Sequence, residues 1–331
     1  MKDYQFNTLT MNTNEIYENI TEKIVSMLDQ HIKNDFKGCW INVSNGSLFA
    51  KNIYSKHVYR GVNQIILSLF MDKYKYSLNN WLTFKQIQKL NGKIKKGSKS
   101  AYVVFSSKLY FDLITNKDIT KIINEMLEID EKVNFAKINV VPYLKYYNVF
   151  NVEQVENLPD EYYKTDEIEK LTEPERIIKA EQIINSTGAE IYFRPQNDAF
   201  YDFENDKIVI PERKQFFNSE LFYITCFHEI AHWTSHPIRL NRKTGFIQGS
   251  KEYAFEELVA ELTSAFLCAT IGIEKHITEN ASYIQSWLKI MNDDKKFVIL
   301  AASKAQEATD FILNLYKTNV KKTEKYAELV I

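Results

Sequence analysis

Apolar residues recur at helical spacing in the first part of the chain. Between residues 12 and 33, isoleucine or leucine occupies every fourth position from Ile16 to Leu28, which places these side chains on one face of a helix. An irregular, turn-rich stretch over residues 38–55 follows, and a second helix is predicted over residues 60–74. The chain is therefore predicted to begin with two helices separated by a loop.

The pattern changes from helical to strand-like after residue 100. Thr83 is a typical helix N-cap, and the short helix that it begins stops at Asn91-Gly92. β-branched and aromatic residues then dominate three runs, 101–106, 108–113 and 135–150, which predict strands. The first half of the chain is thus predicted to be α+β with a mainly antiparallel sheet.

A polar, acidic stretch that contains Pro159 and Pro174 separates the two halves. We predict a linker over residues 153–175, between an N-terminal domain of residues 1–152 and a C-terminal domain of residues 176–331. The predicted fold class is α+β with two domains.

The second half mixes helices with two short strands. One helix is expected to begin at Asn218 or Ser219, which are both good N-cap residues, after a strand that Pro211 ends. The other expected elements are strands over 189–193 and 207–210 and helices over 176–185, 252–270, 279–291 and 295–316. The C-terminal domain is therefore also predicted to be α+β.

The composition is that of a folded protein without a disulfide framework. Hydrophobic residues make up 45% of the chain, while 9 Gly and 6 Pro exclude collagen-like or low-complexity architecture. The three cysteines, Cys39, Cys226 and Cys268, are odd in number and far apart, which fits a reducing compartment. The N-terminus is polar and no stretch approaches about 18 uninterrupted apolar residues, so we expect a cytoplasmic protein with no signal peptide and no membrane span.

The net charge of −1 conceals an asymmetry between the two halves. Residues 1–150 carry 21 Lys and Arg against 13 Asp and Glu, a balance of +8, whereas residues 151–331 carry 21 against 30, a balance of −9. Residues 51–100 alone hold 11 basic residues and one acid, Asp72. We therefore predict a cationic domain joined to an acidic one.

His228-Glu229-Ile230-Ala231-His232 is the motif with the clearest chemistry. It is an H-E-x-x-H pentapeptide within an apolar run that predicts a buried helix. Histidines four residues apart project from the same side of a helix, so both can bind one cation. The adjacent glutamate can then act as general base on a water at that cation. His228 and His232 are the predicted metal ligands, and Glu229 is the predicted catalytic residue.

A third metal ligand is expected from a downstream helix, because a catalytic zinc has three protein ligands and one open position. Glu257 and Glu261 are four residues apart and share a helix face, whereas Glu256 projects about 100° away from Glu257. We predict Glu257 as the ligand, with Glu261 behind it to fix a histidine ring or as the alternative ligand. The predicted cofactor is Zn²⁺, with another divalent metal as the alternative.

His236 and Tyr253 are further residues that we considered for the site. His236 extends the series of histidines, but eight helical residues place it about 12 Å from His228, too far for both to bind one ion. We therefore expect His236 at the rim of the site or at the helix end. Tyr253 is a candidate for stabilising an oxyanion.

Lysines and aromatic residues alternate in the basic half, most densely over residues 81–102. A cationic surface with aromatic rings suits single-stranded nucleic acid, because the charges follow phosphates and the rings stack on bases, each for about 1–3 kcal/mol. A solvated lysine face above a core of aromatic residues explains the same composition equally well. Both interpretations stay open at this point.

Short motifs in both halves together match one protein family. In the first half they are Tyr59-Arg60-Gly61-Val62-Asn63, Trp81 to Gln86, Gly92 to Gly97, Val103-Val104-Phe105 and Tyr146 to Asn151. In the second half they are Ile210-Pro211, His228 to Trp233, His236 to Leu240, Tyr253-Ala254 and Glu256 to Leu262. In this order they resemble the antirestriction proteins of the ArdC type, and the first set is similar to N-terminal regions of plasmid primases.

The resemblance implies an N-terminal domain that binds single-stranded DNA and a C-terminal zincin-like metallopeptidase domain. It also implies protection of incoming plasmid or phage DNA from host restriction, with a protein substrate in the host restriction machinery as a second partner. The family usually has a Pro-Trp-rich segment after its first helix, where this chain has Gly38-Cys39-Trp40-Ile41-Asn42. The candidate DNA contacts are Tyr59, Arg60, Asn63, Trp81, Lys85, Lys93, Lys95, Lys96 and Lys99.

Two other functions stay open from the sequence. In the first, the chain is a DNA-binding antirestriction factor whose metal site is structural and not catalytic. In the second, it is a cytoplasmic metallopeptidase without a DNA role, whose basic half binds a protein substrate. Protection that survives Glu229→Gln would favour the first, and absence of salt-dependent DNA binding would favour the second.

Overall fold

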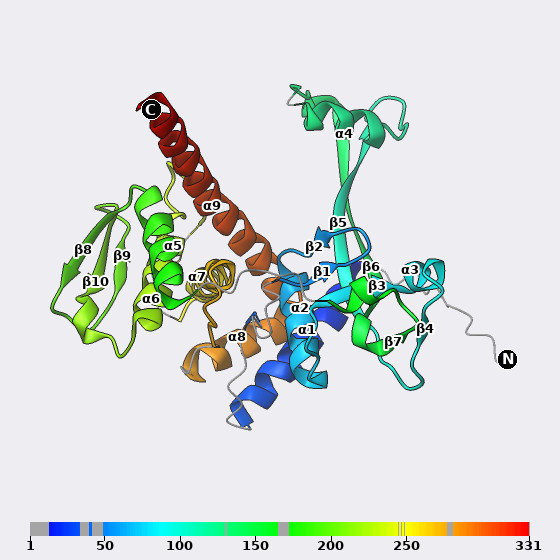
Figure 1. Cartoon of the computed structure of the whole chain (residues 1–331). Coiled ribbons are helices and arrows are strands. Elements are labelled where there is room, and N and C mark those ends of the chain that lie inside the picture. The colour runs from blue at the N-terminus through cyan, green and yellow to red at the C-terminus, as the bar shows by residue number, and fades with distance from the viewer. Residues whose placement is uncertain are drawn as a thin grey trace.

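Helices and strands occur in both halves of the chain, with a larger sheet in the first half and a smaller one in the second (Figure 1). The computed structural model describes residues 13–33, 40–41, 49–129, 131–164, 172–243, 245, 247, 249–276 and 281–330. The α+β class predicted from the hydrophobic pattern is confirmed.

The sheet of the first half is mainly antiparallel, as predicted. In the order in which they lie side by side, its strands are β2 (His57–Val58), β1 (Lys51–Asn52), β3 (Asn80–Thr83), β6 (Ile138–Asn151) and β5 (Ala101–Asp112). β1 pairs in parallel with β3, and the other neighbours are antiparallel. A separate antiparallel pair consists of β4 (Lys93–Ile94) and β7 (Val155–Glu156).

β5 and β6 extend beyond the sheet as a long hairpin, which we call the arm (Figure 1). The two strands pair along the whole length of β5, and α4 (Thr120–Glu128) lies at the end of the arm. The predicted break between strands over 101–106 and 108–113 was wrong, because β5 runs without interruption over Ala101–Asp112 and Ser107 pairs with Tyr143 like its neighbours. The pattern gave no prediction of α4.

Three helices of the first half are α1 (Thr13–Lys33), α2 (Val62–Tyr74) and α3 (Phe84–Lys89). Thr83 caps α3 as predicted: its hydroxyl accepts from the N–H of Gln86 at 3.3 Å, and the Gln86 side chain accepts from the Thr83 N–H at 2.8 Å. α2 begins two residues after its predicted start, because Gly61 has a φ of 54°, outside the helical region.

The second half contains a small sheet and a set of helices (Figure 1). The strands lie in the order β8 (Glu190–Arg194), β10 (Lys207–Pro211) and β9 (Phe200–Asp202), and the helices are α5 (Glu173–Ser186), α6 (Ser219–Trp233), α7 (Lys251–Thr270), α8 (Ala281–Asp293) and α9 (Phe297–Val330). β9 was not predicted, since three residues carry too little pattern. Within the described ranges, no helix is both long and apolar enough to cross a membrane.

The interval predicted as a linker has ordered structure at both ends. β7 pairs with β4, and Val155 and Leu158 are buried in a small core beneath that pair. At the other end, α5 begins at Glu173, before the predicted end of the linker. Residues 165–171 lie outside the described residues, and the domain boundaries at 152 and 176 stay predictions.

One hydrophobic core joins the two halves of the chain. The apolar face of α1, from Ile16 to Leu28, is buried as predicted and packs in a cluster with residues of α2, α7, α8 and α9. Polar contacts cross the same interface: the hydroxyl of Thr21 donates to the Lys295 carbonyl at 2.6 Å, and the N–H of Gly61 donates to the Gln306 side chain at 3.0 Å. The first helix therefore stabilises the second half directly.

We predict that Ile20→Ala, in this shared core, lowers the free energy of unfolding by about 2–5 kcal/mol, because it leaves a cavity at a fully buried position. Circular dichroism and tryptophan fluorescence in a denaturant titration should show one transition that shifts for the whole chain. Ile122→Ala is the control, because Ile122 is 57% exposed in α4, and it should change stability by less than about 0.5 kcal/mol. Two transitions, one of them unmoved by Ile20→Ala, would contradict a shared core.

Candidate metal centre

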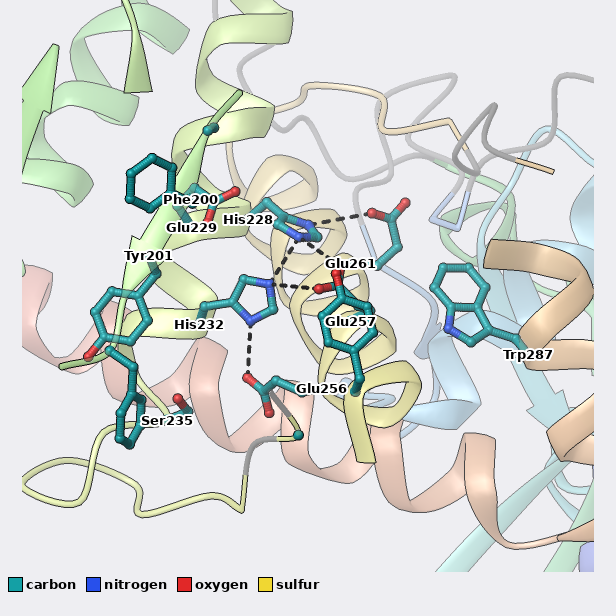
Figure 2. A pocket seen from close by; sticks show the side chains of 14 residues that line it. Phe200, Tyr201, His228, Glu229, His232, Ser235, Glu256, Glu257, Glu261 and Trp287 are labelled. Carbon is teal, nitrogen blue, oxygen red and sulfur yellow. Dashed lines mark hydrogen bonds and ion pairs between the residues drawn. The ribbon is translucent and has the colours of Figure 1, made fainter. Parts of the chain in front are cut away.

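The pentapeptide lies in the second half of α6, and both of its histidines face α7 (Figure 2). α6 begins where predicted, because the side chain of Asn218 accepts the N–H of Leu221 at 2.8 Å and so caps the helix. The rest of α6 packs in an apolar core with α5, β10 and α7. The helix that carries the motif is therefore held on several sides.

His228, His232 and Glu257 come together as the sequence predicted, with one atom of each inside a sphere suited to a single ion (Figure 2). The two Nε2 atoms are 3.2 Å apart, and the Glu257 carboxylate lies 3.6 Å from Nε2 of His228 and 3.7 Å from Nε2 of His232. Ligand atoms bound at about 2.0–2.2 Å to one tetrahedral ion are about 3.3–3.6 Å apart. The three residues therefore fit a divalent metal.

Each histidine has a carboxylate at its outer nitrogen. Oε2 of Glu261 lies 3.7 Å from Nδ1 of His228, and Oε1 of Glu256 lies 3.3 Å from Nδ1 of His232. Such outer carboxylates fix the tautomer and the ring orientation of histidine ligands. Glu261 thus lies at the outer nitrogen of a histidine and not among the candidate ligands, as the sequence predicted. The sequence did not predict the contact of Glu256 with His232. Glu256 projects about 100° away from Glu257 around the helix, so its side chain does not join the candidate ligands but lies against Nδ1 of His232.

Both outer carboxylates are paired with buried cations that the sequence did not reveal. Arg242 donates to the two oxygens of Glu256 at 2.6 and 3.0 Å, and Nζ of Lys275 lies 2.8 Å from Glu261. Arg242 and Lys275 follow α6 and α7 in irregular segments, so no periodic pattern marks them. Because a buried charge without a partner is costly, these two ion pairs make the crowded carboxylates tolerable.

The remaining charges favour a cation at the centre. With Glu256 and Glu261 neutralised by Arg242 and Lys275, the carboxylates of Glu229 and Glu257 leave two negative charges beside the histidines. Burial alone would lower the pKa of His228, but the nearby carboxylates of Glu257, Glu261 and Glu229 raise it to about 10. The site therefore attracts positive charge, and a divalent ion would supply two units of it.

A cavity of about 440 Å³ opens beside the three ligands (Figure 2). Glu229, Tyr253 and Ser235 line it, together with Phe200 and Tyr201 from the edge strand β9. The Tyr253 side chain hydrogen-bonds Glu257, and the Ser235 hydroxyl has no hydrogen-bond partner among the described residues. The arrangement thus brings together three candidate metal ligands and a further carboxylate, Glu229, at the edge of a cavity.

His236 lies apart from the three ligands. Its ring packs against Phe203 with ring centroids 5.3 Å apart, and its Nδ1 accepts the N–H of Ile238 at 3.4 Å. Among the described residues, the group that could hold an ion does not include it. Its position after the end of α6 is the one that helix length and Pro237 predicted.

The chain matches two protein families in consecutive segments. Residues 14–150 match the N-terminal domain of the anti-restriction factor ArdC, and residues 178–304 match a zincin-like metallopeptidase domain. The metal-free crystal structure of ArdC from plasmid R388 is 28% identical, with a TM-score of 0.69 over 91% of this chain and 98% of that one. The Mn(II)-bound structure of that protein, also 28% identical, has a TM-score of 0.67 over 91% of this chain and 97% of its own.

The chain belongs to the ArdC family of antirestriction proteins. The predicted two-domain layout is confirmed with it. Two DNA primases named TraC from Escherichia coli are 28% and 32% identical over 301 and 258 residues, which are 90% and 77% of this chain but 27% and 17% of the primases. An uncharacterised protein of Sinorhizobium fredii, y4eC, is 30% identical over 301 residues, 90% of this chain and 91% of its own length.

Two of the predicted DNA contacts in this ArdC-family chain are core residues. Trp81 is fully buried and Tyr59 is 8% exposed, and both pack in the core above the larger sheet. A ring must be accessible to stack on a base, so the prediction that Tyr59 and Trp81 contact DNA is wrong for this structure. Here the alternative interpretation, of aromatic residues as core, is the correct one.

Two further residues of the ArdC motif hold the fold together. The Asn63 side chain donates to the Val104 carbonyl at 2.8 Å and accepts the Val104 N–H at 2.7 Å, so it satisfies the outer edge of β5. Arg60 pairs with Asp310 of α9. Both residues therefore have partners within the protein.

The predicted lysine contacts remain accessible. Their side chains are all exposed: Lys85, Lys93, Lys95, Lys96 and Lys99. Exposed aromatic residues that the sequence analysis missed lie on the arm, where Phe105 is 49% and Tyr147 is 48% exposed. The β-type runs in the sequence predict that these residues lie on strands. Their exposure could not be predicted, because it depends on how the arm extends away from the rest of the ArdC fold.

We predict that His232→Ala weakens Zn²⁺ binding more than about 100-fold, because a lost ligand should cost more than the 10–100-fold effect of an outer partner. Titration against a chromogenic chelator measures the affinity. His236→Ala should keep the affinity of the wild type, since His236 lies outside the ligand group. Equal losses in the two variants would contradict the ligand set.

Proposed function

We propose that the protein is a metal-dependent peptidase that also binds single-stranded DNA, and that it protects incoming plasmid or phage DNA from host restriction. The observation that carries the peptidase half is the convergence of His228, His232 and Glu257 beside Glu229 at the edge of a cavity. A structural zinc site has four protein ligands and is closed. Three ligands and an adjoining cavity favour catalysis.

Zn²⁺ is the metal that we propose for the site, with Mn²⁺ as the alternative that the related Mn(II)-bound ArdC suggests. Two imidazoles and one carboxylate are a ligand set used by catalytic zinc. When bound, the metal would polarise both a water molecule and the carbonyl of the scissile peptide. Every other step falls to side chains of the protein.

Glu229 is the residue that we propose for proton transfer. It lines the cavity one position after the ligand His228, and it is 7% exposed, so its carboxylate is shielded from bulk water. Glu229 would take a proton from the attacking water and pass it to the leaving amine. The hydroxyl of Tyr253, which hydrogen-bonds Glu257 in this structure, would turn to donate its hydrogen bond to the oxyanion that forms on the carbonyl.

We predict that Glu229→Gln lowers the rate of peptide hydrolysis by about 10²–10⁴-fold while metal binding persists, because the amide cannot accept the proton. The measurement is cleavage of a peptide library by the metal-loaded variant, followed by mass spectrometry. Glu252→Gln is the matched control, since Glu252 is exposed in the first turn of α7 and should leave cleavage unchanged. Cleavage at the wild-type rate by Glu229→Gln would contradict the general-base role, and no cleavage by the metal-loaded wild type would favour a structural metal site.

The arm and the exposed lysines between residues 93 and 99 form the surface that we propose for single-stranded DNA. Phe105 lies opposite Lys145, and Tyr147 lies opposite Val103 two pairs further along β6. Residues opposite each other or two apart share a face of a sheet, so Phe105, Lys145 and Tyr147 point to the same side. Two exposed rings beside a lysine offer stacking to bases and a charge to phosphates.

We predict that Phe105→Ala and Tyr147→Ala each weaken binding of a single-stranded oligonucleotide by about 1–3 kcal/mol, the value of one stacked base. Fluorescence anisotropy at low salt measures the affinity, and rising salt should weaken it further. Phe193→Ala is the control, because Phe193 is 51% exposed on the small sheet of the second half. An equal loss for Phe193→Ala, or no loss for either arm variant, would contradict this surface.

The peptidase and DNA-binding halves suggest a common role. A chain bound to incoming single-stranded DNA would bring its cavity close to host proteins that act on the same DNA. We therefore propose a component of the host restriction machinery as the protein substrate. A peptidase without a DNA role is the alternative. It would be favoured if the wild type did not bind a single-stranded oligonucleotide even at low salt.

A further inference from the structure

Trp40 comes from the N-terminal half but is enclosed by the second half of the chain. Its side chain is fully buried in the shared core, and its ring meets Trp287 edge-on with centroids 6.2 Å apart. Its backbone N–H donates to the Lys275 carbonyl at 3.3 Å. The Trp40 ring is therefore held by α8, and its backbone is held by the segment after α7.

The indole N–H of Trp40 donates to Oε1 of Glu261 at 3.2 Å. The other oxygen of that carboxylate lies 2.8 Å from Nζ of Lys275 and 3.7 Å from Nδ1 of His228. Trp40, Glu261 and Lys275 are buried, so each oxygen of the carboxylate depends on these partners in place of water. The hydrogen bond from Trp40 holds Oε1 and so limits the rotation of the Glu261 carboxylate. The other oxygen, Oε2, is thereby kept facing Nδ1 of His228.

We infer that Trp40 is a positioning residue of the candidate metal centre, which it reaches through Glu261 and His228. A carboxylate at Nδ1 keeps the proton there and leaves Nε2 of His228 to bind the ion. The inference rests on the proposed metal site and adds that the N-terminal half completes it. The two histidines then differ in the origin of their outer support. Trp40 of the N-terminal half supports Glu261 at His228, whereas Arg242 of the second half supports Glu256 at His232.

Trp40→Phe tests this inference, because it keeps an apolar ring and removes the N–H. Zn²⁺ affinity of the full-length chain, measured against a chromogenic chelator, should fall by about 10-fold or more. Trp81→Phe is the matched control: Trp81 is equally buried and donates its N–H to Asn79 at 2.9 Å in another core, so the affinity should not change.

A spectroscopic readout separates positioning from general destabilisation. In the Co²⁺-loaded protein, Trp40→Phe should change the visible absorption of the ion, because the ring of His228 is held less firmly. Trp81→Phe should leave that spectrum as in the wild type. Identical Zn²⁺ affinity and an identical Co²⁺ spectrum for Trp40→Phe and the wild type would overturn the inference and leave the metal site standing. A wild type that binds no metal would instead overturn the proposed site itself.

A measurement on the wild type covers the case in which Trp40→Phe does not fold. The indole N–H signals of the four tryptophans are assigned by NMR and followed during Zn²⁺ addition. The Trp40 signal should shift on binding, because its acceptor Glu261 then supports a metal-bound ring, while the Trp81 signal stays in place. A Trp40 signal that does not move as the metal binds would contradict the link.

Discussion

The burial of α7 between the two hydrophobic cores is the constraint on which the rest of the structure depends. One side of α7 packs with α1, α8 and α9, and its C-terminal end packs with α6 and α5. The helix cannot rotate without breaking both cores. Because its acids are carried on such a fixed helix, Glu257 meets the two histidines and Glu256 and Glu261 meet their outer nitrogens.

The crowding of four carboxylates at this point is possible because two of them are neutralised locally. Arg242 and Lys275 each form a buried ion pair with an outer acid, and breaking such a pair on one side is strongly destabilising. What remains is two further carboxylates, Glu229 and Glu257, beside two imidazoles, and this arrangement favours positive charge at the centre. This charge balance favours a divalent cation at the centre, and the shared core connects the centre to the N-terminal half.

Periodicity predicted the parts of this arrangement that depend on one helix at a time. The buried face of α1, the Asn218 cap of α6, and the shared side of His228 and His232 all follow from spacing along a single element. Glu257 and Glu261 could be predicted for the same reason, because their four-residue spacing lies within the single helix α7. Arg242, Lys275 and Trp40 were not, because they meet the site only through tertiary packing of irregular segments.

Composition was a weaker guide than periodicity in the N-terminal half. It marked aromatic residues and lysines together, but it could not separate the buried Trp81 from the exposed Tyr147. That difference arises because β5 and β6 leave the sheet as an arm, while Trp81 stays in the sheet beneath a cover of aromatic rings. Exposure of this kind is a property of the assembled fold.

The most direct test of the account is anomalous diffraction from crystals of the zinc-loaded protein, recorded at the zinc edge. The account predicts one strong peak about 2.0–2.2 Å from Nε2 of His228, Nε2 of His232 and a carboxylate oxygen of Glu257. It also predicts that the side of the ion that faces Glu229 and the cavity carries no further protein ligand. A peak at His236 or elsewhere, or no peak at full zinc loading, would contradict it.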